Sequence, residues 1–343
     1  MALHLVTGGA GFIGSHLTDR LLVAGHDVVV LDNLDGGKRE NVPHGATLVT
    51  GSIADRAVVD ELFAGHTFDS VFHLAAFAAE GISHAVKAHN YEVNVLGSIH
   101  LINAALRTNV RYFSYASSVA VYGTGRVPMH EDDHPQPADS YGNAKLTIER
   151  ELAITAHLQR LPFTALRMHN VYGERQNMAD PLRNAVAIFL NQIMRGEPIT
   201  VYGDGSQRRS FTYVHDIVGC FLDAADTPRH WNRAINVGSQ QPCTVLEMAH
   251  AVRTAMGVPD HPILHLATRE EVHAAYTSSE LARLLLGGWK DTPLAEGLAA
   301  TAAWARSHGP VNPRSTLTLE VGADTQPEWY TNATATSRED TQP

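Results

Sequence analysis

Short apolar runs alternate with longer segments of helical periodicity through the first half of the chain. The runs are rich in Val, Leu, Ile and aromatic residues and end at Gly, Asp, Asn or Pro, which favours buried strands. Strands that alternate with helices predict an α/β fold, in which helices cover both faces of a parallel sheet. The expected strands are Leu3–Val6, Asp27–Leu31, Thr47–Thr50, Asp69–Leu74, Val110–Ser117 and Phe163–Met168. The expected helices are Ser15–Ala24, Asp55–Ala64, one or two within Ser83–Thr108, and Ser140–Arg160.

The first apolar run ends in a glycine-rich turn that leads into a helical stretch. Three glycines recur in this turn at a spacing of three, at Gly8, Gly11 and Gly14. They let the backbone turn tightly, let a diphosphate approach the main chain and let the helix lie close to the strand. Asp32, at the end of the second strand, is placed to accept ribose hydroxyls and to repel a 2′-phosphate. The turn and the acid together predict a dinucleotide site that prefers NAD to NADP, rather than an ordinary turn.

After about residue 170 the alternation loosens and the connections lengthen. We expect residues 1–170 to form a doubly wound Rossmann domain that binds NAD. Residues 171–309 are expected to form mainly a smaller C-terminal α/β substrate lobe, whose chain can cross back to the first domain. Residues 310–343 have few aliphatic side chains, so burial does not offset their ordering entropy and a flexible tail is expected. The expected elements are strands at Ile199–Tyr202, Phe211–Val214 and Ala234–Val237 and helices at Pro181–Arg195, Asp216–Asp226, Thr244–Met256, Ser278–Leu286 and Leu294–Arg306.

Composition and charge narrow the classes of partner. The chain has 343 residues, of which 44% are hydrophobic and 18% charged, as in a globular protein with a sizeable core. The formal net charge of −10 argues against a nucleic acid or an anionic membrane as partner. The two cysteines form no CxxC pair, no signal peptide precedes the first strand, and no apolar run has the length of a membrane span. We therefore expect a soluble cytoplasmic protein with reduced thiols.

Twenty histidines raise the question of a metal site. His130 and His134, and likewise His261 and His265, have the spacing of two ligands on one helix face. The first pair lies in a proline-rich segment and the second flanks a proline, so neither is on a convincing helix. No HExxH motif or nearby cysteine supports them. No metal is expected.

A tyrosine and a lysine one helical turn apart are the candidate acid–base pair. Tyr141 and Lys145 lie in the expected helix Ser140–Arg160, so their side chains share a face. An ammonium beside a phenol favours the phenolate, which makes a general base of a group whose free pKa is about 10. Ser118 follows the fifth strand, and ligands of Rossmann folds collect at the carboxyl ends of the strands. An exposed helical pair is the alternative, which the serine and the dinucleotide turn disfavour.

Two further stretches carry candidate binding residues. The small residues Ala75 and Ala76 follow the fourth strand and let a flat cofactor lie against the backbone, although core packing explains them equally well. Asn94 lies among apolar helical positions and is expected to be a buried polar anchor near the cofactor. Arg208 and Arg209 stand next to glycines in an acidic protein, which makes them a plausible diphosphate site, with a solvated charge pair as the alternative.

The motifs, taken in order, resemble those of the extended short-chain dehydrogenases, specifically the NAD-dependent nucleotide-sugar epimerases and dehydratases. The resemblance spans about Leu3 to Ser307 and is greatest to UDP-sugar 4-epimerases. It implies an isomerase that removes hydride from C4 of a UDP-sugar, and a homodimer that pairs helices of Ser83–Thr108 and Tyr141–Arg160. The motifs are TGGAGFIG, DN after the second strand, HLAA, SSVAVYG, YGNAK, RMHNVYG, GDGSQRRSFTYVHD and GWK.

The resemblance also implies roles for individual residues. Ser118 and Tyr141 would hydrogen-bond the sugar 4-hydroxyl, and Lys145 would bind the nicotinamide ribose and tune the tyrosine. The residues expected to bind NAD are Gly8, Gly11, Phe12, Ile13, Gly14, Asp32, Asn33, Ser52, Ile53, Leu74, Ala75, Ala76, Asn94, Tyr141, Lys145 and His169. The residues expected to bind the UDP-sugar are Ser118, Tyr141, Asn170, Arg183, Arg209 and Arg269.

The chain departs from the resembled family at several positions. The 4,6-dehydratases resemble one another in an Asp-Glu pair just after the serine, because eliminating water needs an acid and a base. Val119 and Ala120 stand there, which disfavours dehydration. Ser52 stands where the family usually has Asp against adenine, and Ala78 where several 4-epimerases have Lys. The segment Phe77–His89 is also atypical.

We therefore expect a UDP-sugar 4-epimerase of the UDP-glucose or UDP-glucuronate type, acting through a transient 4-keto sugar. Arg183, at the start of an expected helix, is placed to meet a uronate carboxylate, with a solvated arginine as the alternative. A UDP-glucuronate decarboxylase, or another C4-oxidising nucleotide-sugar enzyme, is the second candidate. A non-catalytic NAD-sensing module is the third, and the intact Ser118, Tyr141 and Lys145 argue against it.

Overall fold

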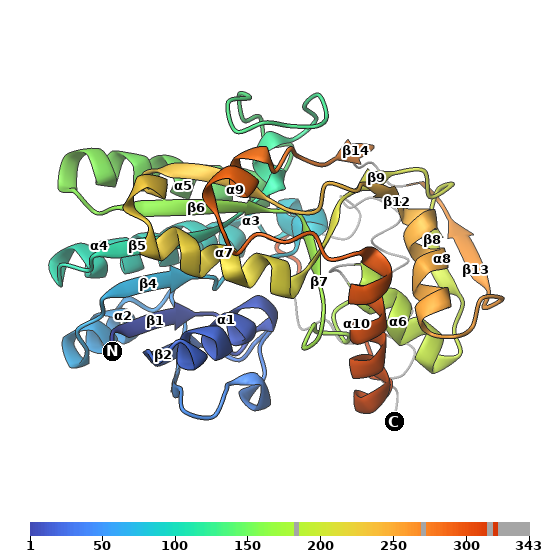
Figure 1. Ribbon diagram of the computed structural model, residues 1–343, viewed down its shortest axis with the longest axis horizontal. Coiled ribbons are helices and arrows are strands. Elements are labelled where there is room, and N and C mark those ends of the chain that lie inside the picture. Colours follow the sequence, from blue (N-terminus) through green and yellow to red (C-terminus); the bar gives the residue numbers. More distant parts are fainter. Residues whose placement is uncertain (182–184, 269–271, 314–317, 322–343) are drawn as a thin grey trace.

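Seven parallel strands form the central sheet, in the order β11-β6-β5-β4-β1-β2-β3 (Figure 1). The computed structural model describes residues 1–181, 185–268, 272–313 and 318–321. The strand order reverses at β1, between β2 and β4, and ligands of such folds bind at the carboxyl ends of the strands there. This is the doubly wound Rossmann arrangement expected from the alternation. The strands are β1 Leu3–Thr7, β2 Asp27–Asp32, β3 Thr47–Thr50, β4 Ser70–His73, β5 Tyr112–Ser118, β6 Phe163–Met168 and β11 Arg233–Val237.

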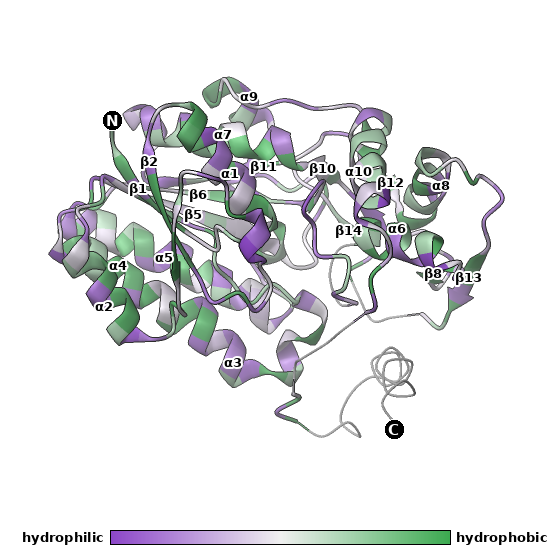
Figure 2. Cartoon of the chain, turned by 90° about the horizontal axis from the view of Figure 1, so that it is seen from below, coloured by the Kyte–Doolittle hydropathy of each residue, from purple (hydrophilic) through white to green (hydrophobic). Residues whose placement is uncertain are grey.

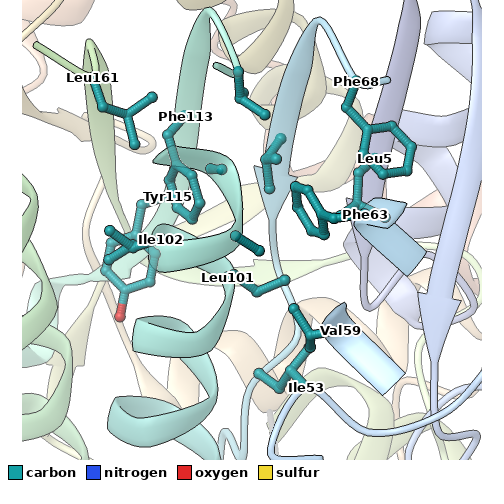
Figure 3. Packing of buried hydrophobic residues seen from close by; sticks show 14 of the residues in the cluster. Leu5, Ile53, Val59, Phe63, Phe68, Leu101, Ile102, Phe113, Tyr115 and Leu161 are labelled. Carbon is teal, nitrogen blue, oxygen red and sulfur yellow. The ribbon is translucent and has the colours of Figure 1, made fainter. Parts of the chain in front are cut away.

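Helices cover both faces of this sheet because successive side chains of each strand point to opposite faces. Leu5 packs with Phe63, Leu101 and Phe113 in one apolar cluster, part of which Figure 3 shows. Val6, the next residue, packs in a second cluster on the other face. Burial of each such side chain contributes about 1.5–3 kcal/mol. The first face is covered by α2 Arg56–Gly65, α4 Ser98–Arg107 and α5 Ser140–Gln159, and the second by α1 Phe12–Val23, α7 Val214–Asp226 and α9 Glu280–Leu285.

Side-chain caps fix where several helices begin. The Asp55 carboxylate accepts a hydrogen bond from the Ala57 N–H at 2.9 Å and so caps α2, directly before the helix rather than in its first turn. Thr244 forms a capping box with Glu247 at the start of α8 Val245–Ala255. Both starts lie within one residue of the expected ones.

The segment expected to hold one or two helices is more irregular. It contains a 3-10 helix, η2 Glu80–Ala85, a short helix, α3 Lys87–Tyr91, and a π-helical turn, η3 Glu92–Gly97, before α4. A π turn adds a residue to the helical repeat and shifts which side chains face inward. Here it places Asn94 in the interior, where the side chain is 2% exposed.

A second lobe packs around its own apolar cluster, on the right of Figure 1. The chain passes between the two parts more than once, since β11, which pairs with β6, and α9, which packs on the first sheet, alternate along the sequence with helices of the second lobe. Residues 182–184 and 269–271, and the tail positions 314–317 and 322–343, lie outside the described residues. The lobe contains α6 Ala185–Arg195, α8, α10 Leu294–His308, β8 Ile199–Tyr202 and β13 Ile263–Leu266. Short strands form two further small sheets, one of β7 Asn170–Tyr172 with β10 Phe211–Tyr213, and one of β12 Cys243–Thr244, β9 Arg208–Arg209 and β14 Ala274–Ala275.

Candidate functional site

A cavity of about 1310 Å³ lies at the carboxyl ends of the parallel strands. Most residues expected to bind the cofactor or the sugar line it, although they come from distant parts of the chain. Asn94 does not line it, and Arg183 and Arg269 lie outside the described residues. The expected residues that line it are Gly8, Gly11, Phe12, Ile13, Gly14, Asp32, Asn33, Ser52, Ile53, Leu74, Ala75, Ala76, Ser118, Tyr141, Lys145, His169, Asn170 and Arg209.

The glycine turn leaves room that a side chain would fill. Gly8 has a φ of +72°, and a Cβ there would lie 2.7 Å from the Ala75 nitrogen. A Cβ at Gly14 would overlap the carbonyl oxygen of Gly8. Gly11 precedes α1 and offers no side chain to cap it, so the first N–H groups of the helix are left for an anion. This cradle fits the diphosphate of a dinucleotide.

Asp32 ties the end of β2 to the glycine turn. Its carboxylate accepts hydrogen bonds from the Ala10 N–H at 3.0 Å and the Leu34 N–H at 2.9 Å. Burial raises the pKa of Asp32, and the backbone N–H groups oppose that shift. The side chain is 7% exposed and still lines the cavity, so it is placed to accept hydroxyls of a ribose. The acid and the cradle together fit NAD.

A buried chain of hydrogen bonds supports the end of β4. His73 bonds Thr7 Oγ1 through Nδ1 and Ser98 Oγ through Nε2, both at 2.8 Å. Burial lowers the pKa of His73 to about 3, so the imidazole is neutral at pH 7. The Asn94 side chain accepts a hydrogen bond from the Phe77 N–H and donates one to the Phe77 carbonyl, each at 2.9 Å. Asn94 is buried, as expected, and shapes the backbone after Ala76 without itself lining the cavity.

Lys145 is buried beside Tyr141. Its Nζ donates to the Ala116 carbonyl at 2.8 Å and lies 5.6 Å from the centroid of the Tyr141 ring. The residue is only 3% exposed, and burial lowers the pKa of Lys145 to about 7. Ser118, at the end of β5, accepts a hydrogen bond from the Ala120 N–H at 3.1 Å. Ser118, Tyr141 and Lys145 therefore line one part of the cavity with a hydroxyl, a phenol and an amine.

Two bonds set the start of α5 and hence the place of Tyr141. Asp139 caps the helix by accepting from the Gly142 N–H at 2.8 Å. Ser83, in η2, accepts from the Tyr141 N–H at 3.1 Å. The wall formed by η2 is thus tied directly to the residue that carries the phenol.

Glu149 and Arg167 form a buried ion pair near Lys145, which was not predicted from the sequence. Arg167 binds the Glu149 carboxylate through two nitrogens, with the shortest contact at 2.7 Å, and Ser117 donates to the same carboxylate. Glu149 follows Lys145 by one turn of α5, and Ser117 follows Ala116 in β5. The helix and the strand that carry the catalytic candidates are therefore joined at two adjacent points. The charged Arg167 within an apolar strand was the signal for such a partner.

Removing one charge of this pair is expected to destabilise the fold. Glu149→Gln leaves the Arg167 guanidinium, whose side chain is 6% exposed, without its anion, and breaking a buried pair costs about 3 kcal/mol or more. The free energy of unfolding should fall by that amount in urea denaturation. The double variant Glu149→Leu, Arg167→Met removes both charges and should cost less. Equal stability of Glu149→Gln and the native chain would contradict this account.

The two adjacent arginines separate in the structure. Arg209 lines the cavity, whereas Arg208 is exposed and donates to the Pro242 carbonyl at 3.0 Å. Neighbouring side chains of a strand point to opposite sides, so only one of the pair faces the ligand space. Asn170 also lines this space and donates weakly to the Ser210 carbonyl at 3.4 Å.

His169 contacts Thr277, which lies between β14 and α9. Its Nε2 accepts a hydrogen bond from the Thr277 N–H at 2.9 Å, and burial lowers the pKa of His169 to about 4. A neutral imidazole thus holds Thr277, while the residue still borders the cavity. Other lining residues that the sequence reasoning did not select include Phe77, Glu80, His84, His89, Thr124, Gln176 and Asn177.

In residues 1–181, 185–268, 272–313 and 318–321, no three His, Cys, Asp or Glu side chains are grouped to hold a metal ion. Within the same ranges no helix has the length and apolar character needed to cross a bilayer.

Known proteins share the sequence and the fold. Residues 4–238 match the NAD dependent epimerase/dehydratase family. UDP-glucose 4-epimerase of Mycolicibacterium smegmatis is 36% identical over 88% of this chain and 98% of that protein. UDP-glucuronic acid decarboxylase 1 of Danio rerio is 31% identical over 87% of this chain and 71% of that protein. The fold also matches the structure of UDP-glucose 4-epimerase from Thermotoga maritima with UDP-glucose, with a TM-score of 0.84 and 34% sequence identity. The match covers 89% of this chain and 99% of that one. The chain belongs to the NAD dependent epimerase/dehydratase family.

Proposed function

We propose that the protein is a UDP-sugar 4-epimerase that acts on UDP-glucose or UDP-glucuronate. The observation that carries the proposal is one cavity with a dinucleotide cradle in one part and Ser118, Tyr141 and the buried Lys145 in another. The related epimerases named above support the reaction class. Incubation with UDP-sugars, with the products resolved by NMR, tests it.

NAD, when bound, supplies an acceptor for the hydride of sugar C4 and gives that hydride back. The residues that would hold it are those of the glycine turn, Asp32 and the end of β4. Tyr141 takes the proton of the 4-hydroxyl as the hydride leaves, and Ser118 orients that hydroxyl. In its protonated form, Lys145 stabilises the phenolate of Tyr141 by its charge. After the keto sugar has rotated in the cavity, return of the hydride to its opposite face would invert C4, while Tyr141 gives its proton back to the C4 oxygen.

The residues after Ser118 bear on the competing reactions. Val119 and Ala120 form the start of η4 Val119–Tyr122 and carry no acid or base, so elimination of water lacks its catalysts there. Loss of carbon dioxide from a 4-keto uronate needs no such pair. The decarboxylase named above makes this the second candidate, which the mass of the product separates from epimerisation.

The diphosphate and the sugar would be held by two further residues that line the cavity, Asn170 and Arg209. Arg209 offers a charge to the diphosphate, and Asn170 offers an amide. Arg269 for the nucleotide or sugar, and Arg183 for a uronate carboxylate, stay proposals because both residues lie outside the described ranges.

Asp32 should decide between the two nicotinamide dinucleotides. Asp32→Ala removes the acceptor of the ribose hydroxyls, so NAD affinity should fall about 10-fold or more and the preference over NADP should narrow. Asp32→Asn is the matched variant, because it keeps the size and loses the charge that repels a 2′-phosphate. Cofactor titrations followed by fluorescence measure both. Equal affinity of the native protein for NAD and NADP would overturn the assignment.

The proposal includes a homodimer in the cytoplasm. Leu96 of η3 and Ile154 and Leu158 of α5 are large apolar side chains that are 49%, 52% and 69% exposed. Their helices pack against each other, so a second copy has an apolar surface to cover. Both cysteines are free thiols, in keeping with a reducing compartment.

A further inference from the structure

Residues Thr318–Val321, here called the C-terminal clasp, lie against the first domain. Figure 2 shows this short described piece beside α3, far along the sequence from the elements that it meets. The Glu320 carboxylate accepts hydrogen bonds from the Ala88 N–H at 2.8 Å and the His89 N–H at 2.7 Å. The Glu320 N–H donates to the Ala85 carbonyl at 3.1 Å. Three polar contacts therefore fasten the clasp to η2 and α3.

An apolar contact accompanies these bonds. Leu319 is half-buried and packs against the cluster of Phe77, Ala79 and Ile82. Phe77 in turn meets the His89 ring edge to face, with centroids 5.1 Å apart. The clasp thus contacts both ends of the segment 77–89, through Leu319 at Phe77 and through Glu320 at His89.

This segment is a wall of the cavity next to the catalytic candidates. Phe77, Glu80, His84 and His89 line the cavity, and Ser83 accepts the hydrogen bond from the Tyr141 N–H. A displacement of η2 would therefore move lining side chains and the start of α5 together. The clasp residues themselves do not line the cavity.

We propose that the clasp is a positioning element for the wall formed by η2 and α3, through which Glu320 and Leu319 set the affinity of the cavity for the sugar. The inference rests on the proposed epimerase function. Glu320 is exposed, and bonds of an exposed carboxylate are weak, so the clasp opens readily and its loss changes binding by a small factor rather than abolishing it. The two N–H groups lower the pKa of Glu320, so the carboxylate that makes these bonds is present at neutral pH.

Two truncations separate the clasp from the rest of the tail. A chain that ends at Pro313 lacks the clasp, whereas a chain that ends at Val321 keeps it. The first should raise KM for the UDP-sugar about two- to fivefold and change kcat by less than about twofold, and the second should match the full chain. In the full chain, Glu320→Gln and Leu319→Ser should each reproduce part of the rise in KM. Asp260→Asn, an exposed carboxylate in another turn, serves as the control.

Hydrogen–deuterium exchange gives a readout that does not need turnover. The amides of residues 85–91 should exchange faster in the chain ending at Pro313 and in Glu320→Gln than in the chain ending at Val321. Unchanged exchange in both overturns the docking, and faster exchange with an unchanged KM overturns the positioning role. If the full chain converts no UDP-sugar, the proposed function fails, and the exchange data alone then decide whether the clasp holds the wall.

Discussion

Replacing Tyr141 by Phe should lower kcat about 100-fold or more and leave the affinity for NAD nearly unchanged. The ring beside Lys145 is retained, but the phenolic oxygen that we propose takes the proton of the sugar hydroxyl is lost. The cradle for the cofactor is built from the glycine turn and Asp32, which the substitution does not touch. Initial rates with a UDP-sugar and a fluorescence titration with NAD measure the two effects separately.

Tyr112→Phe is the matched control for this prediction. Tyr112 is buried and lies in β5, at the end of the strand opposite Ser118. Removing its hydroxyl should leave kcat within about twofold of the native value. Near-native turnover by Tyr141→Phe would instead show that another group accepts the proton.

The cofactor part of the site was readable from the sequence because its information is local. Gly8, Gly14 and the helix after them stand in one short segment, and their spacing between a strand and a helix favours a diphosphate-binding turn. Asp32 reaches the turn through the parallel pairing of β1 with β2, which the hydrophobic pattern already predicts. Tyr141 and Lys145 share a helix face for the same local reason.

The residues that the sequence did not place depend on contacts between distant segments. Arg167 meets Glu149 only because β6 packs against α5. Asn94 is buried because it lies in a π turn, which changes the side chains that face the interior. The return of the chain as β11 follows from sheet packing rather than from a local pattern. Glu320 lies in a segment expected to be a flexible tail, yet within the described part of that tail it binds the backbone of α3.

The product of the reaction is expected to be an isomer of the substrate with inverted C4. The positions after Ser118 hold Val119 and Ala120, so nothing there drives loss of the 6-hydroxyl once C4 is a ketone. The keto sugar is then reduced again rather than dehydrated. The protein should therefore convert UDP-glucose or UDP-glucuronate to a product of unchanged mass, which mass spectrometry and NMR of the ring protons establish together.

Isotopic labelling tests the same reaction more sharply. In an epimerisation the hydrogen that leaves C4 should return to C4 of the same sugar, because the product is at the oxidation level of the substrate and one cavity is lined by both the glycine turn and Tyr141. Deuterium placed at C4 should therefore be retained through turnover, and no reduced cofactor should accumulate in solution. A product that has lost water would establish a dehydratase, and one that has lost carbon dioxide a decarboxylase. We propose that the hydroxyl proton goes to Tyr141 and that the C4 hydride goes to the cofactor. If C4 is inverted but its deuterium is lost to solvent, these two transfers are not separate and the proposal is wrong.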